Sequence, residues 1–176
     1  MPTVINGLPA HILLIHIVIV LVPLGALFTV LSAVWPAARA KLGFVSPLTC
    51  LIALVFVPIT THAGTWLRDH LRAQQGDNPA IDRHANLGGT FLIYALGLFI
   101  VSAGVWWLGR MFELTGTTTA TRTETATATA AATKALPQWA SILIAVVAVA
   151  VSAVTVWQLY RIGDSGSHAV WGGIVK

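Results

Sequence analysis

Only 9% of the 176 residues are charged, while 56% are hydrophobic, and the mean hydropathy is +0.81. A soluble domain carries about 25% charged residues, so this composition excludes a water-soluble globular protein and predicts an integral membrane protein. The net charge of +4 belongs to the loops of such a protein and gives no reason to expect a nucleic-acid partner.

Four long apolar segments predict an all-α, polytopic membrane protein with four transmembrane helices in an up-down bundle. Each segment supplies the roughly 20 apolar residues that a helix needs to cross a bilayer. A helix also satisfies every backbone polar group within the segment, which lipid requires. We expect helices near residues 11–35, 46–67, 87–110 and 137–160, forming a single membrane domain over residues 1–176.

The first predicted helix sets the expected orientation. No Lys or Arg precedes residue 39, and the apolar stretch is longer than the core of a signal peptide, so we expect this helix to be retained. Lys and Arg divide five against five between the two sides, but Arg39 and Lys41 directly follow the first helix. Because the first helix often dominates orientation, we expect both the N-terminus and the C-terminus outside.

The second helix and the connection after it contain two residues of interest. Cys50 has no partner cysteine in the chain, and we expect a small buried residue. The segment 68–84 reads as a solvated connector with a Gly-Asp-Asn-Pro turn at 76–79. Asp82 is expected to cap the third helix, with the alternative that its carboxylate orients a nearby imidazole.

Residues 115–134 form a Thr/Ala-rich stretch of low complexity, which is typical of a flexible linker. A glycosylated outer stalk is the alternative, and it would invert the expected orientation. After the fourth helix, "GDSGS" at 163–167 looks like the nucleophile segment of trypsin-like proteases. That chemistry needs an oriented base on a β-barrel scaffold, so Gly163 is instead expected to cap the helix C-terminus. We therefore do not expect an enzyme that acts by itself.

Histidines are concentrated at one end of the predicted bundle. An up-down chain places the start of helix one, the end of helix two, the start of helix three and the end of helix four on the same side. All six histidines lie at or near that side: His11, His16, His62, His70, His84 and His168. Ionisable residues within spanning helices usually face the bundle interior, so this end is the predicted functional site.

Depth and position rank the histidines as ligand candidates. We expect His16 and His84 to matter most, His62 next and His11 also to border the bundle, with His70 and His168 least involved. His11 and His16 are about 140° apart around a helix, so they cannot both point the same way. Asp82 or a backbone carbonyl near Thr60 is available to orient an imidazole.

Four kinds of chemistry suit these imidazoles. Haem b is held by two histidines from facing helices, and Gly88 and Gly89 would allow a flat macrocycle to approach. Three or four histidines, drawn from His11, His16, His62 and His84, would instead bind Zn or Cu. A protonatable cluster near a quinol is a third reading, and simple hydrogen bonding at the membrane interface is the fourth.

Four short motifs resemble the DUF2231 family of bacterial four-helix membrane proteins, in its actinobacterial variant. They are "NGLPAHILLIH" at 6–16, "TTHAGTWL" at 60–67, "RHANLGG" at 83–89 and "YRIGDSGSHAVW" at 160–171. The resemblance implies a bacterial plasma membrane and matches His11, His16 and His84 to family histidines. Ile12 replaces a family proline, and His62 stands where relatives carry an acidic residue. Some relatives are fused to cytochrome c-like domains, which implies electron transfer by analogy.

The sequence therefore predicts a small membrane protein associated with electron transfer, with haem b or a metal ion at the outer end of the bundle. The alternative is an accessory subunit without a cofactor, packed in a larger membrane complex or a homo-oligomer through its Gly- and Ala-rich helix faces. A transporter is a third possibility, although the sequence shows no inverted repeat.

Overall fold

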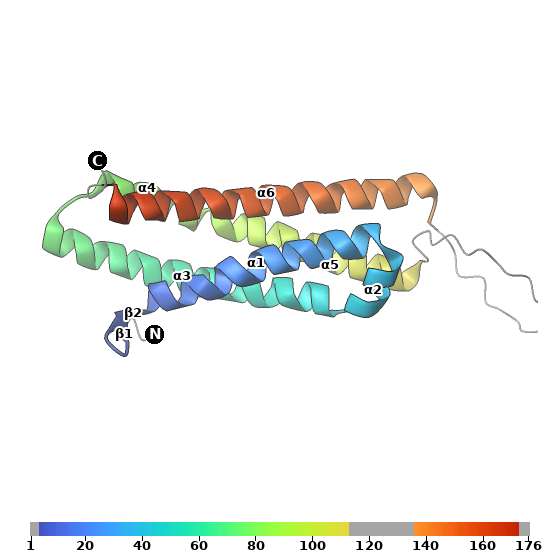
Figure 1. The fold of residues 1–176 in the computed structure, drawn as a ribbon, viewed down its shortest axis with the longest axis horizontal. Coiled ribbons are helices and arrows are strands. Elements are labelled where there is room, and N and C mark those ends of the chain that lie inside the picture. The colour runs from blue at the N-terminus through green and yellow to red at the C-terminus, as the bar shows by residue number, and fades with distance from the viewer. Residues whose placement is uncertain (1–3, 113–135, 173–176) are drawn as a thin grey trace, which may run out of the picture.

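The computed structural model describes residues 4–112 and 136–172, which form long helices lying side by side (Figure 1). A two-stranded hairpin, β1 (Val4–Ile5) and β2 (Leu8–Pro9), precedes the helices. The helices are α1 (Ala10–Val34), α2 (Pro36–Leu42), α3 (Val45–Gln75), α4 (Pro79–Gly89), α5 (Phe91–Met111) and α6 (Gln138–Trp171). The predicted linker at 115–134 lies outside the described residues.

Four helical segments of the described chain are long and apolar enough to cross a membrane: Ala10–Val34, Val45–Gln75, Pro79–Met111 and Gln138–Trp171. They run alternately along the long axis of the molecule (Figure 1). This arrangement confirms the prediction of an all-α, polytopic up-down bundle. We call the end where α1 begins, α3 ends, α4 begins and α6 ends the histidine end.

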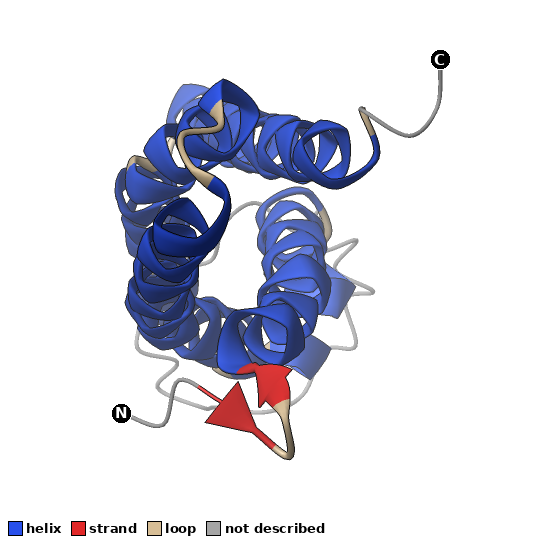
Figure 2. Ribbon diagram, turned by 90° about the vertical axis from the view of Figure 1, so that its left-hand side faces the viewer, coloured by secondary structure: helices blue, strands red, loops and turns tan. Residues whose placement is uncertain are grey.

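The bundle is closed by contacts between neighbouring helices. α1 packs against α3 and α6, and α5 packs against the same two helices, so the four long helices form a ring when viewed along the bundle (Figure 2). The core between them contains Val22, Leu98 and Cys50, all fully buried. A Cβ at Gly25 of α1 would lie 2.8 Å from the sulfur of Cys50. Cys50 is therefore the small buried residue that the sequence predicted.

The connection between α3 and α4 is much shorter than the predicted solvated connector. α3 continues for two more turns past residue 67, because Arg, Leu, Ala and Gln at 68–75 are good helix formers. Gly76, with φ of 82°, ends α3. The side chain of Asn78 accepts a hydrogen bond of 3.0 Å from the amide of Ala80, and Pro79 follows at the first helical position. Asn78, not Asp82, is thus the helix cap.

α6 also exceeds its predicted length, and the interpretation of Gly163 as a C-cap is wrong. The helix runs through "GDSGS" to Trp171. A glycine inside a helix costs about 1 kcal/mol relative to alanine, but Ile162 and Ser165 are buried here, and α6 packs against α4. Burial of the side of α6 that carries Ile162 and Ser165 outweighs the weak helix propensity of Gly163 and Gly166.

Two short elements were not predicted from hydropathy. Asn6 and Gly7, with φ of 49° and 80°, form the turn between β1 and β2, which is the typical backbone of an Asn-Gly hairpin. At the opposite end of the molecule, α2 folds back so that Arg39 donates to the carbonyls of Ser32 (2.7 Å) and Ala33 (3.2 Å). Partial burial there lowers the pKa of the Arg39 guanidinium from its ordinary value. Arg39 thereby satisfies carbonyls that the end of α1 leaves unpaired.

Candidate functional site

The structure brings together two of the six histidines, His11 from the first turn of α1 and His84 from the middle of α4. Their ring centroids are 6.2 Å apart and the ring planes are inclined by 77°. Both side chains are half-buried. They are 73 positions apart in the sequence, so only the folding of the bundle makes them neighbours. This His11–His84 pair is the candidate site.

His11 is held against α3. Its Nδ1 lies 3.0 Å from the carbonyl oxygen of Thr60. A carbonyl oxygen has no hydrogen to donate, so Nδ1 carries the proton in this hydrogen bond. The ring lies over Gly64, where an added Cβ would come within 3.0 Å of both Cε1 and Nδ1. Thr60 therefore orients the imidazole, and Gly64 provides the space that it occupies.

His84 is held against α6 in the same way. Its Nδ1 lies 3.0 Å from the carbonyl oxygen of Ile162 and 3.2 Å from the hydroxyl of Ser165. The Ser165 hydroxyl donates to the Ile162 carbonyl at 2.8 Å, so both oxygens are acceptors for the proton on Nδ1. A Cβ at Gly166 would lie 3.0 Å from Cε1 of His84. The ring is thus fixed by a carbonyl and accommodated by a glycine one turn later.

These contacts determine what each imidazole is able to do. With Nδ1 protonated, the lone pair of a neutral ring is on Nε2. Among the described residues, Nε2 of neither ring makes a hydrogen bond. Metal-bound histidines almost always donate their second ring N–H to a carbonyl or carboxylate, which fixes the tautomer and the ring orientation. The pair therefore offers two oriented nitrogen ligands or two proton acceptors.

The other two histidines placed at membrane depth do not join this pair. His16 is exposed, and its Nδ1 donates to the carbonyl of Ile12 in its own helix at 2.6 Å. His62 is also exposed, next to the buried residues Thr60 and Ala63. The expectation that both border the bundle interior is wrong, because the phase of each helix turns the buried positions away from residues 16 and 62.

His70 and His168 lie further out, as expected. His70 stacks on Trp66, with ring centroids 5.1 Å apart, and its Nε2 is 3.0 Å from Gln74. His168 lies 3.7 Å from Asp164, and both side chains are exposed. Neither residue contacts the His11–His84 pair through any interaction found in the described part of the chain. They remain outside the candidate site.

Asp82 does not orient an imidazole. Its carboxylate accepts a hydrogen bond of 3.0 Å from Arg72 across the connection between α3 and α4. The predicted alternative orienting group, a carbonyl near Thr60, is the one that His11 uses. Within residues 4–112 and 136–172, no group of three or more His, Cys, Asp and Glu side chains is arranged to hold a metal ion. The predicted set of three or four histidine ligands is therefore not assembled here.

Sequence reasoning missed the two glycines that support the rings and emphasised two others. Gly88 and Gly89 were expected to allow close approach, but a Cβ at either position would meet open space. Gly64 and Gly166 make the close contacts instead. The sequence did contain a signal. Gly64 follows Thr60 by four residues and Gly166 follows Ile162 by four, and each glycine precedes a Thr or Ser. Helical spacing alone places such a carbonyl and glycine on one face.

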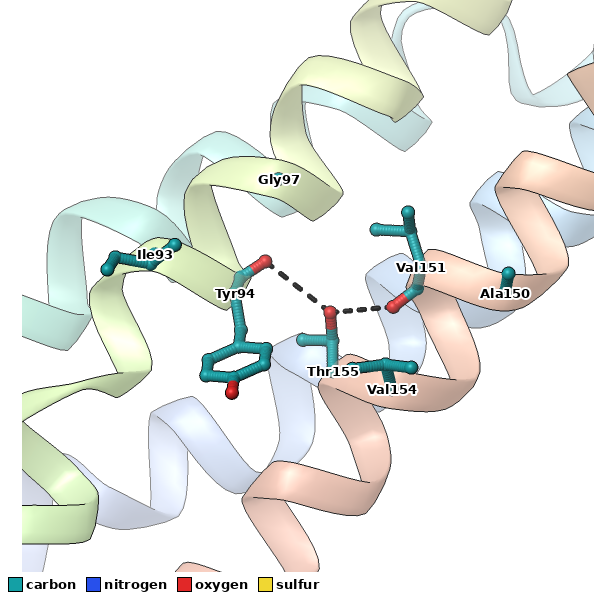
Figure 3. Close-up of a pocket in the computed structure, with 7 residues that line it drawn as sticks. All are labelled: Ile93, Tyr94, Gly97, Ala150, Val151, Val154 and Thr155. Atoms are coloured by element: carbon teal, nitrogen blue, oxygen red, sulfur yellow. Dashed lines mark hydrogen bonds between the residues drawn. The ribbon is translucent and has the colours of Figure 1, made fainter.

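Two cavities in the described part of the chain lie away from the histidines. One, of about 270 Å³, opens between α5 and α6 and is lined by Ile93 and Gly97 on one side and by Ala150, Val151 and Val154 on the other (Figure 3). At its edge, the Thr155 hydroxyl donates to the carbonyls of Val151 and Tyr94 (Figure 3). The lining is largely apolar, and Tyr94 and Thr155 are its residues with polar side-chain groups.

Fold and site together define a polytopic α-helical membrane protein with a pair of oriented histidines at one end of its bundle. Comparison with protein-family models, with curated proteins and with solved structures found no match. The resemblance to the DUF2231 family accordingly stays a prediction from four sequence motifs.

Proposed function

We propose that the protein is an electron-transfer-associated protein of the bacterial plasma membrane in which His11 and His84 bind the iron of haem b or a single metal ion. The observation that carries the proposal is the pair itself: two imidazoles with Nδ1 bound to backbone carbonyls and Nε2 without a partner in the described chain. The pair replaces the larger set that includes His16 and His62.

The distance between the rings supports one shared centre. A metal–nitrogen bond is about 2.0 Å long, so two imidazoles on one ion place their ring centroids roughly 5 to 6.5 Å apart, depending on the bond angle. The observed 6.2 Å between the ring centroids lies within this range, so His11 and His84 would be able to hold one shared centre, either haem iron or a bare ion.

The number of ligands favours haem over a bare ion. Structural zinc sites use four protein ligands and catalytic sites three, whereas the described residues offer no group of three. Haem would need only two ligands from the protein, His11 and His84, because its macrocycle supplies the others. When bound, it supplies one-electron redox chemistry. Cu or Zn would have to complete its coordination with ligands from outside the pair.

The chain's own residues have definite roles in this proposal. The carbonyls of Thr60 and Ile162 accept the proton on Nδ1, so the lone pair of each neutral ring is on Nε2 and the hydrogen bond fixes the ring orientation. Gly64 and Gly166 let the rings lie close to the backbones of α3 and α6. Both rings are half-buried, and this partial burial would tune the potential of a bound centre.

Absorption spectra and metal analysis of the protein isolated from its native membrane test the proposal. We expect a Soret band with reduced-state α and β bands, or one equivalent of metal. His11→Ala and His84→Ala should each lose or shift this signal. His16→Ala and His62→Ala are matched controls on the same helices, and they should leave it unchanged because both side chains are exposed. Wild-type protein without haem or stoichiometric metal would contradict the proposal.

One observation favours the alternative of an accessory subunit without a cofactor. The cavity between α5 and α6 is apolar, and its wall includes Gly97 and Ala150, which allow an apolar segment of another subunit to approach closely (Figure 3). This alternative predicts that Gly97→Leu removes the protein from a larger membrane complex on native gels. It also predicts that His11→Ala and His84→Ala leave that complex intact.

A further inference from the structure

We infer that the bundle is a tandem repeat of two helical hairpins, and that the ligand of His11 and His84 lies on the pseudo-two-fold axis between them. The first repeat contains α1 and α3, and the second contains α4, α5 and α6. This inference rests on the proposed function, because it deepens the description of the same site. Each repeat supplies one of the two equivalent histidines, His11 from the first and His84 from the second.

The first helices of the two repeats bury equivalent positions. His84 follows His11 by 73 residues, and the same separation relates the buried residues of α5 to those of α1. All five buried positions of α5 have a buried counterpart in α1. These pairs are Val18 with Phe91, Val22 with Ala95, Gly25 with Leu98, Thr29 with Ser102, and Ser32 with Val105.

The second helices of the repeats match at a separation of 102 residues, because a longer connection precedes α6. Five of the six buried positions of α6 have a buried counterpart in α3 at this separation. They are Ser46 with Ala148, Cys50 with Ser152, Ala53 with Thr155, Thr60 with Ile162, and Ala63 with Ser165. The exception is Gln158. The counterpart of buried Val57 in α6 is residue 159, and the neighbouring Gln158 is buried instead.

The contacts around the histidines repeat with the same separations. His11 donates to the carbonyl of Thr60 and His84 to that of Ile162, both at 3.0 Å. Gly64 and Gly166 lie under the two rings at equivalent positions. Even a peripheral bond repeats: the Thr65 hydroxyl donates to the carbonyl of His62, and the Ser167 hydroxyl to that of Asp164, both at 2.8 Å.

Helix packing agrees with a two-fold relation. Exchanging α1 with α5 and α3 with α6 leaves the set of neighbouring helices unchanged, since α1 and α5 each pack against both α3 and α6. An axis along the bundle that relates the repeats therefore also exchanges His11 with His84. A ligand bound equally by both must present two equivalent coordination positions. A single metal centre held by both histidines, such as haem iron, would meet this requirement.

The inference predicts equal effects of equivalent changes in the two repeats. Purified protein in detergent is titrated with hemin and, separately, with Cu²⁺. Gly64→Ala and Gly166→Ala each place a Cβ 3.0 Å from one ring, which must then shift. We expect each to weaken binding by up to about 10- to 100-fold, the effect of removing a ligand's hydrogen-bonded support. Gly163→Ala is the control, since a Cβ at this position on α6 meets open space. It should not change the affinity.

His11→Ala and His84→Ala remove atoms instead of adding them, so they test the same point if a glycine variant fails to fold. Both should weaken binding by the same factor. Binding to the wild type that depends on only one histidine and its glycine would overturn the on-axis site while leaving a cofactor-binding function intact. A wild type that binds neither hemin nor Cu²⁺ would overturn the proposed function and the inference together.

Discussion

Helical phase at single residues decides which histidines face the bundle. His11 and His16 are five residues apart, and the buried residues Ala10, Val18 and Val22 show which side of α1 is internal. The sequence allowed the conclusion that His11 and His16 diverge, but not which of them faces inward. Both lie in an almost uniformly apolar helix, whose inner and outer surfaces have nearly the same composition when the solvent is lipid.

The contact between Gly25 and Cys50 gives a residue-scale prediction. Gly25→Ala should lower the stability of the bundle by about 1–3 kcal/mol, as overpacking of a tight core does, because its Cβ would lie 2.8 Å from a buried sulfur. In a Cys50→Ala background the clash is absent, and alanine's better helix propensity should make the same change neutral or stabilising. Thermal unfolding in detergent measures both. An equal change in stability from Gly25→Ala in the wild type and in the Cys50→Ala background would show that the Cβ does not clash with the Cys50 sulfur.

Among the secondary-structure elements, the signals at helix ends were harder to interpret than the spans themselves. Hydropathy located all four spanning helices, but it ended α3 before Arg68 and α6 before Arg161, the first charged residue after each span. Both helices continue, because helix-forming polar residues extend α3 and buried packing extends α6. Hydropathy shows which residues are apolar enough to lie within the membrane. A helix ends elsewhere, where a cap or a turn satisfies its backbone.

The cap at Asn78 gives a prediction for the start of α4, the helix that carries His84. Asn78→Ala removes the acceptor of the Ala80 amide hydrogen bond and should cost about 1 kcal/mol of stability. Asn78→Asp retains an acceptor at the same place and should restore most of that loss. Chemical unfolding followed by circular dichroism makes the comparison. Equal stabilities of the alanine variant and the wild type would show that the cap contributes nothing.

For the whole molecule, the sequence predicted the class of fold and the end that carries the histidines, but not the repeat. Equivalent positions hold different residues, such as Val18 with Phe91 and Ser32 with Val105, so the duplication is visible in the burial pattern and hardly at all in residue identity. Membrane cores tolerate such exchanges when size and close packing are balanced across the interface. Leu14 with Leu87 and Val45 with Val147 are identical, and so are two pairs at the candidate site, His11 with His84 and Gly64 with Gly166.

Orientation in the membrane is a further prediction at this scale. If the first helix dominates topology, cysteines placed at residues 5 and 172 should react with an impermeant reagent on intact cells, and a cysteine at residue 125 should not. Cys50 is buried, so the natural chain should give no background. Labelling at residue 125 alone would place the histidine end in the cytoplasm.

Pulsed EPR of the oxidised protein, isolated from its native membrane, tests the central claim most directly. A haem or copper centre held by His11 and His84 should show nitrogen couplings from two imidazoles. Either alanine variant should retain one imidazole at most, and His16→Ala should retain both. Couplings that survive in both His11→Ala and His84→Ala, or a wild type with neither a paramagnetic centre nor stoichiometric metal, would contradict the claim that this pair is the binding site.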